Sequence, residues 1–146
     1  MRHFTAAMAL LVATALGSAR AEVRVDAGLA KGYDGEEATV AGLAWLSDQR
    51  HPWEVMLGYI AERERADIPN ANFLALSKRF YWRGWFASGG VAWVSVDNEV
   101  LSGHGQFMTG VGHDFGRLTL SLRHLSNGST SGRNHGETFA LLEVAF

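Results

Sequence analysis

Residues 118–146 read LTLSLRHLSNGSTSGRNHGETFALLEVAF, and they hold two apolar segments joined by a polar, glycine-rich loop. In the first segment, leucines at positions 118, 120 and 122 alternate with polar residues at 119, 121 and 123. This alternation is typical of a β-strand with one apolar face. His124 and Ser126 continue the leucine face, where a strand in contact with lipid normally carries only apolar side chains. A histidine and a serine on that face need a chemical explanation.

The same alternation recurs along the whole chain after Ala21. Strands are expected at residues 23–29, 38–46, 53–62, 72–81, 84–96, 106–113, 118–126 and 137–146. Most have the length that a tilted strand needs to cross a bilayer, and an even number permits antiparallel closure without exposed edges. Tryptophan and tyrosine near the strand ends fit the aromatic girdles of membrane barrels. The sequence predicts an all-β fold, an eight-stranded antiparallel transmembrane β-barrel; the alternative is a soluble barrel with its apolar face inward.

The first 21 residues have the three parts of a cleaved secretory signal peptide. Arg2 is basic, Phe4–Leu16 is apolar, and Ala19-Arg20-Ala21 forms an A-x-A close. An uncleaved anchor helix is the alternative, although the apolar run is short for a membrane span. Residues 22–146 are then expected to form one outer-membrane barrel domain in a bacterial envelope.

Composition excludes several classes of protein. The formal net charge is −2, without a run of lysine or arginine, so nucleic acid is not an expected partner. The chain has no cysteine, which excludes a disulfide framework and a thiolate zinc site. The histidines at 104, 113 and 135 lack zinc-protease spacing, so neither a metal nor a cofactor is predicted.

The lengths of the connections predict an orientation. Residues 32–37, 63–71, 97–105 and 127–136 form the longer set, and 47–52, 82–83 and 114–117 the shorter. Membrane barrels have long extracellular loops and short periplasmic turns, so Ser126 is expected at the outer-leaflet end of its strand. Arg24, Asp26 and Arg123 are expected in a charged network that fills a narrow lumen.

Acyl-transfer chemistry explains a histidine and a serine two residues apart. Ser126 would be the nucleophile and His124 its general base, since alternate residues of a strand share a face about 7 Å apart. Glu137 opens the next strand; a symmetric hairpin would place it opposite Ser126 and diagonal to His124, as the carboxylate that orients the imidazole. The alternative is that both are ordinary polar residues at a membrane interface.

An ester hydrolase of this kind also needs hydrogen-bond donors for the oxyanion. The loop after Ser126 supplies three candidates, Asn127, Gly128 and Asn134, through side-chain amides or backbone N–H groups. Gly128 also allows the chain to turn sharply.

The segment resembles the active-site region of the lipid A 3-O-deacylase (PagL) family, and the matching residues are His124, Ser126, Asn127, Asn134 and Glu137. The resemblance implies an outer-membrane esterase with a Ser-His-Glu triad on the outside of the barrel. Its substrate would be lipopolysaccharide, from which it would remove the 3-hydroxyacyl chain at position 3 of lipid A. Two alternatives stay open: a non-catalytic small barrel with a binding or structural role, and a lipid A palmitoyl transferase. A homodimer also stays open.

One feature of the last strand departs from this scheme. Glu143 shares a face with Glu137, which is an awkward place for a carboxylate if that face meets lipid. Glu137 and Phe146 also fall on opposite faces, and a β-bulge, or a terminal residue past the edge of the bilayer, would resolve the conflict.

Overall fold

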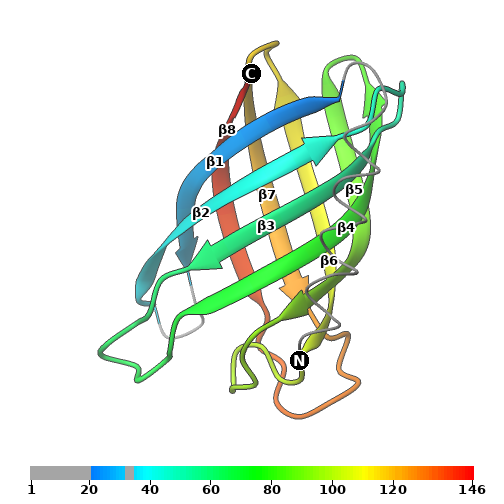
Figure 1. Cartoon of the computed structure of the whole chain (residues 1–146). Coiled ribbons are helices and arrows are strands. Elements are labelled where there is room, and N and C mark those ends of the chain that lie inside the picture. Colours follow the sequence, from blue (N-terminus) through cyan, green and yellow to red (C-terminus); the bar gives the residue numbers. More distant parts are fainter. Residues whose placement is uncertain (1–20, 32–34) are drawn as a thin grey trace, which may run out of the picture.

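The computed structural model describes residues 21–31 and 35–146, so the predicted signal peptide lies outside the described residues except for Ala21. The described residues contain eight strands: β1 (Glu22–Lys31), β2 (Glu37–Leu46), β3 (Trp53–Ile60), β4 (Ala71–Trp82), β5 (Trp85–Val94), β6 (Gly105–Asp114), β7 (Leu118–Ser126) and β8 (Glu137–Ala145). Each strand pairs antiparallel with its neighbours in the sequence, and β8 pairs with β1 to close the barrel (Figure 1). The predicted eight-stranded antiparallel barrel is confirmed.

The two ends of the barrel differ in their connections (Figure 1). One end, here called the long-loop end, carries the connections β3–β4, β5–β6 and β7–β8, which run over residues 61–70, 95–104 and 127–136. The opposite, short-turn end carries residues 47–52, 83–84 and 115–117, together with the C-terminus. Ser126 and Glu137 lie at the long-loop end, as the sequence predicted.

The outward face of the barrel is apolar along most of its height. Alternate residues of every strand are exposed, among them Val25, Leu43, Leu57, Leu76, Val91, Val111, Leu120 and Leu142. Tryptophans lie close to the strand ends, as Trp53, Trp82, Trp85 and Trp93 do. Among the described residues, no helix is long and apolar enough to cross a membrane.

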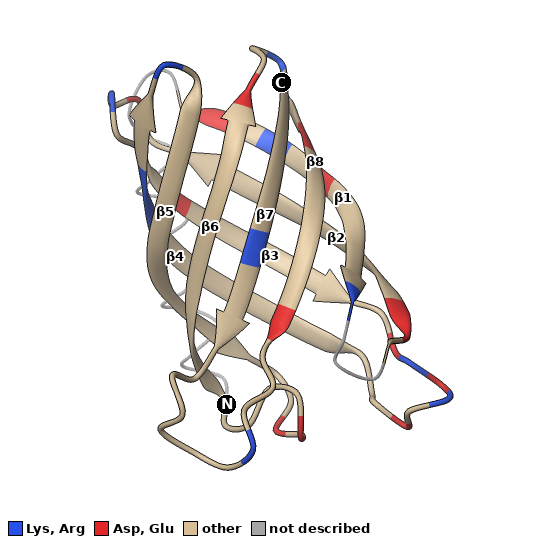
Figure 2. Cartoon of the chain, turned by 180° about the vertical axis from the view of Figure 1, so that it is seen from behind, with Lys and Arg blue, Asp and Glu red and all other residues tan. Residues whose placement is uncertain are grey.

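The half of the lumen near the short-turn end is filled by ion pairs. Arg123 of β7 bridges Glu54 of β3 at 2.9 Å and Glu143 of β8 at 3.1 Å. Arg79 of β4 bonds the same two carboxylates, that of Glu143 at 2.8 Å. Figure 2 shows a blue Lys or Arg segment in the middle of β7, the strand that carries Arg123. The two guanidiniums and the two carboxylates neutralise each other's charges across the barrel. This network fills one half of the lumen, and the sequence predicted such a network for a narrow barrel.

The other two predicted lumen residues differ in their partners. Arg24 joins the network through an ion pair with Glu143 at 3.5 Å, and it also donates to Thr119 and Asp114. Asp26 is also buried inside the barrel, but within the described part of the chain neither of its carboxylate oxygens has a hydrogen-bond partner.

The half of the lumen near the long-loop end is mainly apolar, although it also holds the buried Glu137. Phe73, Met108, Leu125 and Phe139 lie inside it and are almost completely buried. Val100 and Leu101 of the β5–β6 loop are buried in the same apolar cluster, so this loop packs into the end of the barrel. The barrel therefore offers a rigid, filled scaffold, and a reaction site must lie on its outside or at its rim.

Candidate active site

His124 and Ser126 lie on the outward face of β7. Both are partly exposed, whereas Arg123 and Leu125 on the opposite face are buried. The side chains of His124 and Ser126 therefore point away from the lumen, as the leucine pattern predicted. On the neighbouring strand β6 they face Thr109 and Phe107, respectively.

Two N–H groups of the β7–β8 loop point at the Ser126 hydroxyl. Asn134 donates from Nδ2 to Ser126 Oγ at 2.7 Å, and the backbone N–H of Gly128 donates to the same oxygen at 3.2 Å. Gly128 has a φ of 64°, a left-handed conformation that glycine adopts without strain. The loop thus folds back over the serine, and two of its N–H groups are bonded to the serine hydroxyl.

Asn127 was predicted to offer a side-chain amide or a backbone N–H to the oxyanion, and in the structure both groups have other partners. Its side-chain amide is buried and donates to the carbonyl oxygens of Ser102 at 2.6 Å and Ser131 at 2.5 Å. Its backbone N–H donates to Asn134 Oδ1 at 3.2 Å. Asn127 therefore holds the loop together and orients Asn134, and its side-chain amide is turned away from Ser126.

The imidazole of His124 contacts β8 on one side. Its Nδ1 lies 2.8 Å from Thr138 Oγ1, in the residue that pairs with it across the β7–β8 ladder. The other edge of the ring lies against Gly136, where an added Cβ would be 2.6 Å from His124 Cε1 and 2.9 Å from Nε2. Glycine at 136 therefore makes room for the ring. Within the described residues no hydrogen bond joins His124 to Ser126, a contact that commonly tightens only when substrate binds.

The predicted contact between Glu137 and His124 is wrong. Glu137 pairs with Leu125 in the β7–β8 register, so it shares the inward face, and its side chain is buried. Both carboxylate oxygens accept hydrogen bonds from Arg63, at 2.7 and 3.0 Å. Arg63 in turn donates to the carbonyl oxygen of Glu36. This pair, here called the Arg63–Glu137 lock, ties the β3–β4 loop to the start of β8, which Figure 2 marks as a charged segment.

The inward direction of Glu137 also resolves the awkward position of Glu143. The two residues share a face, and that face is the lumen, where each has arginine partners. The β7–β8 and β8–β1 ladders run in continuous register, so β8 has no bulge along its length.

The β5–β6 loop supports the site from behind. Its Val100 accepts a hydrogen bond from the backbone N–H of Gly136 at 2.9 Å, and its Ser102 bonds the carbonyl oxygen of Arg133. Because Ser102 also accepts from Asn127, the loops after β5 and β7 form one bonded unit. The position of Asn134 relative to Ser126 is therefore fixed by contacts from both loops.

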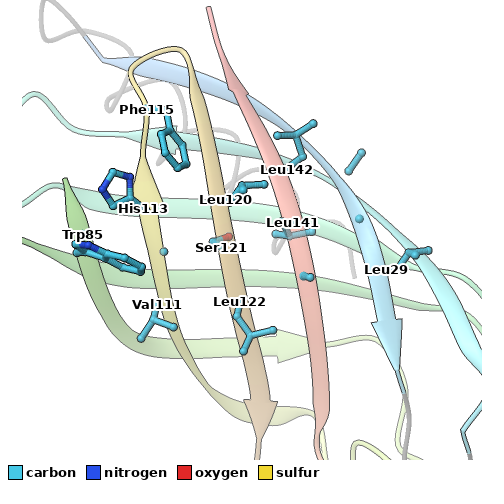
Figure 3. Close-up of a pocket in the computed structure, with 14 residues that line it drawn as sticks. Leu29, Trp85, Val111, His113, Phe115, Leu120, Ser121, Leu122, Leu141 and Leu142 are labelled. Atoms are coloured by element: carbon cyan, nitrogen blue, oxygen red, sulfur yellow. The ribbon is translucent and has the colours of Figure 1, made fainter.

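An apolar groove of about 630 Å³ runs over the outside of the barrel below these residues. It extends from Leu122 and Ala140, each two residues from the site on its own strand, toward His113 and Phe115 at the short-turn end. Figure 3 shows Val111 and Leu122 at one end of the groove and His113 and Phe115 at the other. Its surface is almost entirely apolar, which suits a hydrocarbon chain.

The sequence reasoning missed Thr138, Gly136 and Arg63. The pattern could have identified Thr138, since it continues the outward series Ala140, Leu142 and Val144 in steps of two. Arg63 is 74 residues from Glu137 and carries no local signal. In the described part of the chain, no group of three or more histidine, aspartate or glutamate residues is placed to hold a metal ion.

The chain is similar to known proteins both in sequence and in fold. A family profile described as "Lipid A 3-O-deacylase (PagL)" matches residues 36–146. A structure described as "Crystal structure of the outer membrane enzyme PagL" is similar with a TM-score of 0.57 and 17% identity, over 84% of this chain and 98% of that one. At that identity the structural likeness shows a common fold. No curated protein matches the chain.

Proposed function

The chain belongs to the lipid A 3-O-deacylase (PagL) family, and on this premise we propose that it hydrolyses the ester-linked 3-hydroxyacyl chain at position 3 of lipid A. One observation carries the proposal: the Ser126 hydroxyl lies on the outside of the barrel with two N–H donors aimed at it, from Asn134 and Gly128. A serine held this way is suited to acyl transfer.

The proposed reaction has two acyl-transfer steps. Ser126 Oγ attacks the ester carbonyl while Nε2 of His124 takes the hydroxyl proton. Once Oγ has bonded to the carbonyl carbon, the former carbonyl oxygen is the oxyanion and lies beside Oγ, so the N–H groups of Asn134 and Gly128 that now donate to Oγ would turn to it. His124 then gives the proton to the departing sugar oxygen. A water molecule activated by His124 releases the fatty acid from Ser126.

The apolar groove supports a long acyl substrate. It starts directly below His124 and Thr138 on β7 and β8, so a chain lying in it would present its ester carbonyl near Ser126. The groove follows the strands, and four residues of β7 span on the order of 13 Å. A fatty acyl chain could lie there in contact with both the barrel and neighbouring lipids.

We further propose an outer-membrane location with the long-loop end facing outward. The apolar outer face and the terminal tryptophans suit a bilayer, and long connections on the outside are the rule for such barrels. Ser126 then lies at the level of the outer leaflet. Lipid A would reach it by diffusion within the membrane.

Mass spectrometry of lipid A tests this function. Lipid A from cells that express the protein should be lighter by the mass of one 3-hydroxyacyl chain. Ser126→Ala and His124→Ala should each lower the rate of deacylation by at least ~10³-fold, while the barrel still folds. The two effects should not add, because the residues act as one unit. A control is Ser95→Ala, in the β5–β6 loop, where the hydroxyl accepts from the backbone of Asn72.

The same spectrum separates the alternatives. Unchanged lipid A would indicate a non-catalytic barrel, and a gain in mass would indicate an acyl transferase. Near-normal release of the fatty acid by Ser126→Ala would show that the nucleophile is assigned incorrectly, although the chain would still belong to the family.

A further inference from the structure

The residue that contacts the imidazole of His124 is a threonine. Thr138 Oγ1 lies 2.8 Å from His124 Nδ1, and the two residues pair directly across the β7–β8 ladder. The carboxylate of the adjacent residue, Glu137, is buried on the other side of the strand and held by Arg63 at 2.7 and 3.0 Å. The carboxylate of Glu137 therefore cannot also contact the imidazole on the outward face of β8.

The other neighbours of His124 on the outward face carry no charge. Thr109 faces it from β6, Thr138 and Gly136 flank it from β8, and Leu122 and Ser126 precede and follow it on β7. Among these described neighbours, Thr138 is the one with a hydrogen bond to the ring. The imidazole is thus held by a neutral hydroxyl.

We propose that Thr138 is a positioning residue, whose hydroxyl oxygen accepts the Nδ1–H of His124 and replaces a carboxylate as the third member of the site; this rests on the proposed function. A neutral imidazole has one N–H and one lone pair. With the N–H at Nδ1 bonded to Thr138, the lone pair is on Nε2, the nitrogen that must take the proton of Ser126.

Two features of β8 support this arrangement. Gly136 leaves open the space that the ring edge occupies, because a Cβ there would come within 2.6 Å of His124 Cε1. Thr138 is β-branched, which restricts its χ1 rotation and so limits the positions of its hydroxyl. The ring is therefore oriented by a bond on one side and by close packing on the other.

The proton balance of the reaction is unaffected by the replacement. His124 gains a proton on Nε2 during attack and loses it to the leaving oxygen, while Nδ1–H stays bonded to Thr138 throughout. A threonine hydroxyl stabilises the transient imidazolium by a dipole, whereas a carboxylate would do so by a full charge. This difference gives the proposal a distinctive test.

The test compares four variants of the full-length barrel refolded in detergent, assayed by release of 3-hydroxy fatty acid from lipid A. Thr138→Val keeps the shape and removes the hydroxyl, so kcat should fall about tenfold with KM unchanged. Thr138→Ser keeps the hydroxyl, so its kcat should be close to that of the wild type. Thr138→Glu should move the acid limb of the kcat/KM profile about one unit to higher pH, because an anion favours protonated His124. Thr109→Val, opposite His124 on β6, is the matched control and should behave as wild type.

The outcomes separate this proposal from the proposed function. Wild-type kcat in Thr138→Val, or an acid limb that Thr138→Glu does not move, would overturn the role of Thr138. If Ser126→Ala is inactive in the same assay, that result leaves the esterase assignment intact. If the wild-type protein releases no fatty acid, the proposed function fails, and if Ser126→Ala is active, the nucleophile is assigned incorrectly. Should Thr138→Val not fold, the pH profile of Thr138→Glu decides.

Discussion

At the scale of single residues, two asparagines of one loop do different work. Asn134 aims its side-chain N–H at Ser126 Oγ, 2.7 Å away. The side-chain amide of Asn127 donates hydrogen bonds to the carbonyl oxygens of Ser102 and Ser131, in two neighbouring loop segments. Asn134 thus contacts the proposed nucleophile, whereas Asn127 holds the loop in shape.

This contrast predicts different kinetic effects for the two alanine variants. Asn134→Ala should lower kcat by about 10²-fold with little change in KM, because an oxyanion donor acts mainly in the transition state. Asn127→Ala should instead lower the urea midpoint of unfolding, since buried carbonyls lose their donor. Steady-state kinetics and urea titration of both variants check this. Equal kcat values for Asn134→Ala and wild type would exclude Asn134 from the oxyanion site.

At the scale of elements, the β3–β4 loop is joined to the start of β8 by a buried ion pair. Arg63 and Glu137 are each about 1% exposed and share two hydrogen bonds. Because Gly136 and Thr138 flank Glu137, the lock also determines where the residues around His124 lie. It connects two loops that are far apart in the sequence.

The lock predicts a loss of stability when one partner is neutralised. Glu137→Gln leaves the guanidinium of Arg63 buried without its counter-charge and should cost about 3 kcal/mol or more of unfolding free energy. The double variant Arg63→Met/Glu137→Gln should recover part of it. Urea titration monitored by the gel shift of the folded barrel measures both. At temperatures where Glu137→Gln stays folded, kcat should stay near wild type; a 10²-fold loss there would show that Glu137 acts on His124 after all.

The strands, and the side of β7 that faces outward, could be predicted from the sequence. The side of β8 that faces outward was not predicted correctly. Leucines alternate with polar residues along β7, so its outward side is evident. In β8 both faces are apolar, because the lumen near the long-loop end holds Phe139 and Leu141 while the outside holds Ala140 and Leu142. Glu143 was the indication that the face of Glu137 is inward, and the register of Glu137 was predicted one residue away from its position. Its partner Arg63 depends on a loop conformation that no local pattern encodes.

At the scale of the whole molecule, the inside of the barrel is filled and the functional groups are outside. The ion-pair network occupies one half of the lumen, and the apolar cluster with Val100 and Leu101 occupies the other. The groove on the outer surface then becomes the natural place for the acyl chain.

This placement predicts that filling the groove will block long substrates selectively. Ala140 faces outward between Leu122 of β7 and Leu29 of β1. Ala140→Trp should lower kcat/KM for lipid A at least about tenfold, because the indole occupies the space of the chain. A short ester such as p-nitrophenyl acetate should be hydrolysed nearly as before. Ala41→Trp, on the outward face of β2, is the control. An equal loss of kcat/KM for both esters would indicate damage to the site. No loss of kcat/KM for lipid A would show that the acyl chain of the substrate binds elsewhere.

An outward site on a closed barrel has a consequence for how the rate depends on concentration. On the proposed function, substrate would reach Ser126 along the plane of the bilayer, so the rate would depend on the number of lipid A molecules per unit of membrane area, rather than per volume of solution. Diluting lipid A with inert phospholipid at a fixed bulk concentration would then slow the enzyme, as it would for any catalyst confined to two dimensions. Other lipids become competitors for the groove merely by being neighbours. The composition of the surrounding leaflet would set the working speed of the protein.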